Sequence, residues 1–151
     1  MGGDELTQEK ILVVDDQKEI CDLVQDYLEL EGYQVITAYD GEEALKLYRR
    51  HNPVLVILDV MLPSLHGAEV LRRFSKQLKN TRVLIFSGYE DAALLRELLE
   101  AGAHGFVGKS APLSELQKGI QIVASGGSYF GPEVALILRE AMANPTSFSK
   151  P

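Results

Sequence analysis

The sequence of 151 residues has little of several residue types, and each shortage excludes a class of protein. Its single cysteine, Cys21, excludes an intramolecular disulfide framework and a zinc site built from several cysteines. No apolar run approaches the ~20 residues that span a membrane. The first ten residues are acidic and contain two glycines, unlike a signal or transit peptide. We therefore expect a cytoplasmic protein that does not bind a membrane.

Basic residues are also scarce, since 15 Lys and Arg face 22 Asp and Glu for a net charge of −7. Nucleic-acid phosphates need a basic surface, so this balance argues against DNA or RNA binding by this chain alone. Hydrophobic residues make up 46% of the chain and charged residues 25%, which is ordinary for a globular protein. The length suits one domain with a short extension, large enough to bury a core.

Short runs of aliphatic residues recur along the chain and predict buried strands. Three are continuous, over 11–14, 54–58 and 83–86. A weaker strand is expected over 33–38, and a very short one around Phe106 and Val107. Strands that are buried on both faces lack polar alternation, so these runs indicate a parallel sheet.

Between these runs, apolar residues recur with the spacing of helices that pack one face on a core. Asp40 and Glu43 have the spacing of an N-terminal capping box and open one such helix. Five strands thus alternate with five helices, which predicts an α/β fold with helices on both faces of the sheet. The apolar stripes of the other four helices begin at Ile20, Val70, Leu94 and Leu113.

One more helix is predicted after this alternation. Gly131 and Pro132 suit the N-cap and first turn of a helix, and an apolar stripe follows from Val134. The sequence leaves open whether this stripe packs on its own domain or pairs with a second chain.

Polar residues follow the predicted strands at the points where they end. Asp15 and Asp16 follow the first run, Asp59 the third, Ser87 the fourth, and Lys109 the fifth. Because the carboxyl ends of parallel strands meet at one edge of a sheet, these side chains should converge there.

This set of groups favours phosphoryl chemistry. Three clustered carboxylates repel one another, and a hard divalent cation such as Mg²⁺ relieves that repulsion. A hydroxyl and an ammonium group suit the oxygens of a phosphoryl group. Asp59, on the central strand, is best placed to act as a nucleophile that forms an acyl phosphate. The residues therefore predict a Mg²⁺-assisted site that accepts a phosphoryl group.

With these motifs in place, the chain resembles the response regulator receiver domains of two-component signalling over roughly residues 10–125. The resemblance implies a flavodoxin-like, doubly wound parallel sheet of five strands in the order 2-1-3-4-5. It rests on the segments 11–16, 58–63 with Gly67, 86–88 and 105–109, in that order.

The resemblance implies a role for each site residue. Asp59 would accept a phosphoryl group from a phosphohistidine of a sensor histidine kinase, and Lys109 would pair with its charge. Ser87 would bond a phosphoryl oxygen, and Phe106 would move inward as Ser87 shifts. The Mg²⁺ ligands would be Asp15, Asp16, Asp59 and the backbone carbonyl of Met61. Such a domain is a phosphoacceptor that assists its own phosphorylation and dephosphorylation, rather than an enzyme.

The segment 126–134 resembles the stretch that follows the receiver in NarL/FixJ (LuxR-type) transcription factors. This implies a disordered N-terminus over 1–9, a receiver over 10–125, and a linker helix and tail over 126–151 toward a helix-turn-helix domain that is absent here. Output would be control of transcription, with DNA bound only through that domain, and phosphorylation can produce a homodimer.

Other readings stay open at this point. A stand-alone receiver would act through protein contacts, and a binding module would carry the same site unused. A flavodoxin-like enzyme is a third reading, but Met61 offers no general acid two residues after Asp59.

Overall fold

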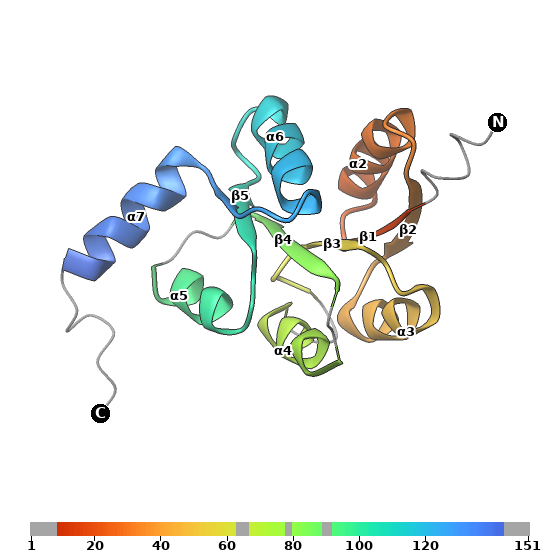
Figure 1. Ribbon diagram of the computed structural model, residues 1–151, viewed down its shortest axis with the longest axis horizontal. Coiled ribbons are helices and arrows are strands. Elements are labelled where there is room, and N and C mark those ends of the chain that lie inside the picture. Colours follow the sequence, from red (N-terminus) through yellow and green to blue (C-terminus); the bar gives the residue numbers. More distant parts are fainter. Residues whose placement is uncertain (1–8, 63–66, 78–79, 89–91, 144–151) are drawn as a thin grey trace.

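Strands and helices alternate from β1 to α7 within residues 9–62, 67–77, 80–88 and 92–143, which the computed structural model describes (Figure 1). The predicted tails at the two ends of the chain lie largely outside these ranges. The elements are β1 (Lys10–Val14), α2 (Lys18–Leu30), β2 (Gln34–Ala38), α3 (Gly41–His51), β3 (Leu55–Leu58), α4 (Gly67–Gln77), β4 (Arg82–Ser87), α5 (Ala92–Glu100), β5 (Gly105–Gly108), α6 (Leu113–Ala124), β6 (Tyr129–Phe130) and α7 (Pro132–Ala143).

The sheet has the strand order β2-β1-β3-β4-β5-β6, and every neighbouring pair is parallel. The predicted order of the first five strands is confirmed, but the predicted number of strands was wrong by one. β6 was missed because two residues carry no periodicity. Gly105 allows β6 to approach, since a Cβ atom there would lie 2.6 Å from the carbonyl oxygen of Tyr129.

Two helical layers cover the sheet. α2 and α6 lie on one face, and α3, α4 and α5 lie on the other (Figure 1). Along β1, Leu12 and Val14 join the core under α3 and α4, whereas Ile11 and Val13 join the core under α2 and α6. Each residue of the strand is therefore buried on one side or the other, which explains why the strand is continuously apolar.

Helix boundaries follow local signals in the sequence. Asp40 accepts a hydrogen bond from the backbone N–H of Glu43 at 2.9 Å, which is one half of the predicted capping box. The side chain of Glu43 accepts from the N–H of Tyr39 instead of that of Asp40. Asn52 ends α3 in the left-handed conformation, with φ of 54°. Gly32 and Gly102 follow α2 and α5 with φ of 94° and 111°, a conformation that costs glycine little.

α7 packs on its own domain, against α5 and β5 (Figure 1). Val134 anchors it with 2% of its surface exposed, and Ile137 packs against the same core cluster. Leu136 points elsewhere and stays 53% exposed. The first two residues of the predicted stripe, Val134 and Ile137, therefore pack within the chain.

Across the described ranges, every helix is too short or too polar to cross a membrane.

Candidate functional site

The polar residues that follow the strands meet at one edge of the sheet, as predicted. One carboxylate oxygen from each of Asp15, Asp16 and Asp59 lies within 4.8 Å of the others. The ammonium group of Lys109 lies 2.7 Å from an oxygen of Asp15 and 3.2 Å from one of Asp59. Ser87 lines the same cleft. Residues separated by up to 94 positions in the chain therefore form one site.

The ends of the strands hold these residues through the backbone. The N–H of Asp15 donates to the carbonyl of Ala38 at 3.0 Å, and the N–H of Asp59 donates to that of Val14 at 2.9 Å. The N–H of Lys109 donates to the carbonyl of Ser87 at 3.0 Å. Each bond continues the pairing of the sheet by one residue. The backbones of Asp15, Asp59 and Lys109 are thus hydrogen-bonded to neighbouring strands, although each residue lies just beyond its own strand.

Burial differs among the carboxylates. Asp15 and Asp59 are only 2% and 4% exposed, whereas Asp16 is exposed to solvent. Burial raises the pKa of Asp15, although hydrogen bonds from Lys109 and from the N–H of Gln17 oppose the rise. The negative charge of Asp59 also raises the pKa of Asp15, so the two buried carboxylates repel each other.

Lys109 is the counterion of the two buried carboxylates. Burial lowers its pKa, but the hydrogen bond to Asp15 and the negative charge of Asp59 outweigh burial, so the pKa is raised overall. The ammonium group therefore stays charged at neutral pH. It also donates to the side-chain oxygen of Gln17 at 3.0 Å.

These groups border an open cleft of about 430 Å³. Met61 stands at its rim, half exposed, and its N–H donates to Asp59 Oδ1 at 3.2 Å. The lining residues are Asp16, Gln17, Asp59, Met61, Ser87, Gly88 and Lys109. The cleft thus offers carboxylate oxygens, a hydroxyl and an ammonium group to one small, charged ligand.

Phe106 lies outside the cleft, on β5, and is already buried at 1% exposure in the core cluster that contains Val134. Gln17 borders the cleft but was not predicted from the sequence. Its only signal there was its position directly after the acidic pair, and the contact with Lys109 spans 92 positions.

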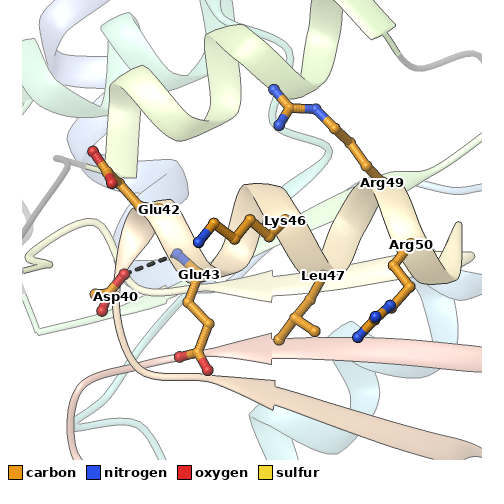
Figure 2. Close-up of a pocket in the computed structure, with 7 residues that line it drawn as sticks. All are labelled: Asp40, Glu42, Glu43, Lys46, Leu47, Arg49 and Arg50. Carbon is orange, nitrogen blue, oxygen red and sulfur yellow. Dashed lines mark hydrogen bonds between the residues drawn. The ribbon is translucent and has the colours of Figure 1, made fainter.

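A larger hollow of about 760 Å³ runs along the outer side of α3 and shares no residue with this cleft. Figure 2 shows acidic residues at one end of it and arginines at the other, with the side chains of Arg49 and Arg50 pointing apart. Charged residues spaced along one helix are typical of a solvated surface. Its lining is Asp40, Glu42, Glu43, Lys46, Leu47, Arg49 and Arg50.

Cys21 is a buried cysteine next to the backbone of Asp15. Its thiol donates to the backbone carbonyl of Asp15 at 3.4 Å, and burial raises its pKa to about 11. A thiol that stays protonated is a poor nucleophile. Cys21 therefore supports the packing of α2 beneath the site.

Comparison with known proteins identifies relatives of this chain. Residues 11–121 match the family described as the response regulator receiver domain. The chain is 31% identical to the response regulator GacA of Pseudomonas aeruginosa over 144 residues, covering 94% of this chain and 67% of GacA. It is 34% identical to sporulation initiation phosphotransferase F of Bacillus subtilis over 116 residues, covering 77% of this chain and 94% of that protein.

A solved structure agrees with the fold. The crystal structure of a LuxR-family two-component response regulator from Aurantimonas sp. SI85-9A1 has a TM-score of 0.83 and 31% identity, covering 90% of this chain and 99% of that one. Four curated relatives, each named as a response regulator or a transcriptional regulator, are longer than this chain. The chain spans between 42% and 67% of their lengths.

Proposed function

Because the chain belongs to the response regulator receiver family, we propose that Asp59 accepts a phosphoryl group from a phosphohistidine of a sensor histidine kinase. The observation that carries this proposal is the convergence of three carboxylates and Lys109 on one cleft. Three hard oxygen donors beside a cationic group are suited to a phosphoryl group together with a divalent metal ion.

The carboxylate cluster fits Mg²⁺. Asp15, Asp16 and Asp59 place oxygens within 4.8 Å of one another, and Mg²⁺ favours a few carboxylates completed by water and phosphate oxygens. The backbone carbonyl of Met61 is the further protein ligand that we propose. When bound, the ion supplies positive charge that offsets the repulsion between these carboxylates and the incoming phosphoryl oxygens.

Asp59 is the nucleophile in this proposal. One of its oxygens forms a bond to phosphorus while the phosphorus–nitrogen bond of the phosphohistidine breaks, and the released imidazole takes up a proton. Lys109 already contacts Asp59 Oδ2 at 3.2 Å, so its charge lies where the transferred oxygens arrive. Ser87 offers a hydroxyl at the end of β4, the strand next to β3. Positioning and charge thus supply the assistance, and the chain remains an acceptor rather than a multiple-turnover enzyme.

Ser87 and Phe106 form the proposed switch. Ser87 pairs with Gly108 across β4 and β5, two residues from Phe106, so a shift of Ser87 toward the phosphoryl group acts on β5 directly. Phe106 is packed at 1% exposure, so the change involves repacking of a filled core and not the filling of a cavity. Such a change is a shift between two populated states.

Control of transcription is the proposed output, because relatives that extend beyond this domain are named as transcriptional regulators. DNA contact would come from a separate helix-turn-helix domain. The alternative is a receiver that acts alone through protein contacts, and it is distinguished by the parent reading frame. A cytoplasmic location and a homodimer formed on phosphorylation remain predictions.

The test is labelling by acetyl phosphate with Mg²⁺, followed on a phosphate-affinity gel. The band of the wild-type protein should be retarded on this gel. The band of Asp59→Ala should not, because this variant lacks the nucleophilic oxygens. Asp22→Ala, which removes an exposed carboxylate on α2, is the matched control and should shift as wild type does. Undiminished labelling of Asp59→Ala would exclude Asp59 as the acceptor.

A further inference from the structure

Gln17 joins the two charged parts of the cleft. Its backbone N–H donates to Asp15 Oδ1 at 2.9 Å, and its side-chain oxygen accepts from Lys109 Nζ at 3.0 Å. An ammonium group only donates, so the amide oxygen of Gln17 must be the atom that faces Lys109. One residue therefore braces an acidic residue through its backbone and the ammonium group through its side chain.

Helix formation does not explain a glutamine at this position. Gln17 is the N-cap of α2, where Ser, Thr, Asp or Asn is favoured, and its side chain makes no capping bond. The side chain instead lies in the cleft, which it lines with Lys109 and Asp16. The identity of the residue thus relates to the cleft rather than to the helix.

The other two acceptors of Lys109 belong to the carboxylate cluster. They are Asp15 Oδ2 at 2.7 Å and Asp59 Oδ2 at 3.2 Å. A divalent cation held by the same carboxylates competes with the ammonium group for those oxygens and repels it. Gln17 is neutral and supplies an oxygen outside the cluster, so its bond to Lys109 does not compete with the cation.

We propose that Gln17 is a positioning residue that keeps Lys109 at the phosphoryl cleft when the carboxylate cluster holds a divalent cation. The inference rests on the proposed phosphoacceptor function. Without Gln17, the ammonium group displaced from Asp15 and Asp59 is free to swing toward solvent. The ammonium group of Lys109 then has to return to the cleft before the phosphoryl group is transferred, and this requirement slows the reaction.

The experiment compares two variants of the full chain. Gln17→Ser removes the acceptor near Lys109 but provides a better helix cap, so a fault in α2 cannot explain its loss of rate. Gln17→Glu keeps an acceptor oxygen at the same reach but adds a negative charge beside the carboxylate cluster. Gln25→Ser makes the same substitution eight residues later, within α2 and outside the cleft, and serves as the control.

The rate of labelling by acetyl phosphate at saturating Mg²⁺ should fall roughly 3- to 10-fold in Gln17→Ser, the range expected for one partly exposed bond to a charged group. Gln17→Glu should recover only part of that rate, because its added negative charge repels the phosphoryl oxygens, and Gln25→Ser should label as wild type does. The dissociation constant for Mg²⁺ should stay within about twofold in Gln17→Ser, because the serine change leaves the backbone N–H to Asp15 in place.

A second readout does not depend on labelling. In the Mg²⁺-loaded protein, NMR of the Lys109 side chain should show slower motion of its terminal methylene in wild type than in Gln17→Ser. Equal motion and an equal rate in the two proteins would overturn the role of Gln17 while leaving the phosphoacceptor function intact. Absence of labelling in wild type itself would overturn the function, and this inference with it.

Discussion

Replacement of Lys109 by methionine isolates the contribution of its charge. Methionine keeps the length and most of the volume of the side chain but removes the ammonium group that Asp15 and Asp59 share at 2.7 and 3.2 Å. Both carboxylates are nearly buried, at 2% and 4% exposure. Lys109→Met therefore leaves two buried negative charges without a counterion in the absence of a divalent cation.

The expected cost is about 2 kcal/mol of unfolding free energy. Removal of one partner from a fully buried ion pair costs roughly 3–5 kcal/mol. We take a smaller value because the Lys109 side chain is 18% exposed to solvent in an open cleft, where water screens the charges. For a domain of this size, about 2 kcal/mol lowers the Tm by about 4–8 °C.

The same variant should bind Mg²⁺ more tightly, on the order of tenfold, because no ammonium group competes for the carboxylate oxygens. Thermal unfolding followed by circular dichroism, first with EDTA and then with saturating MgCl₂, measures both effects. Lys109→Met should be less stable than wild type in EDTA and should gain more from Mg²⁺. Lys118→Met, an exposed lysine on α6, is the control.

Equal stability of Lys109→Met and wild type in EDTA would refute the counterion role. A gain from Mg²⁺ no larger than that of wild type would refute the competition for carboxylate oxygens. The second result would also remove the premise of the role assigned to Gln17.

Two further predictions follow from buried contacts away from the cleft. Val134→Ala should destabilise the chain by about 2 kcal/mol, because it loses buried apolar surface and leaves a cavity under α7. Leu136→Ala, at a 53% exposed position, should change stability by less than about 0.5 kcal/mol. Chemical denaturation measures both values, and equal effects would contradict the packing of α7 through Val134. His104 accepts a hydrogen bond from the N–H of Val83 at 2.9 Å, and burial, aided by the charge of Arg82, lowers its pKa, so its contribution should be complete above about pH 6.5 and should decline as pH falls below that value, where the unfolded chain takes up the proton more readily. His104→Asn should flatten this part of the stability profile, and an unchanged profile would show that another group titrates there.

The order of strands and helices was predictable because apolar runs, helical spacing and capping residues mark each element locally. The runs 11–14 and 83–86 lie wholly in strands with both faces covered, and the run 54–58 does so from residue 55 onward. Asp40 of the predicted capping box opens α3, and the predicted stripe that begins at Leu94 lies in α5. Such signals depend on a few neighbouring residues, so they survive without knowledge of the tertiary fold.

β6 could not be predicted from local sequence patterns. Tyr129 and Phe130 are too few to show a period, and their pairing depends on Gly105, which lies 24 positions earlier than Tyr129. The exposure of Leu113, at 44%, was also not predictable, because its stripe spacing is the same as that of buried Leu116. Both outcomes depend on which element packs against which.

The sequence by itself determined the type of fold and most of the charged residues of the cleft, because apolar runs dictate strands and parallel strands place their ends at one edge. It also determined that Asp15, Asp16, Asp59, Ser87 and Lys109 would lie at the same edge of the sheet, since each follows a parallel strand. Only the tertiary structure decided how Lys109 is shared between Asp15, Asp59 and Gln17. The physical reason is that contacts of a long, flexible ammonium side chain depend on distances of a few ångströms between separate strand ends, and no local pattern encodes those distances.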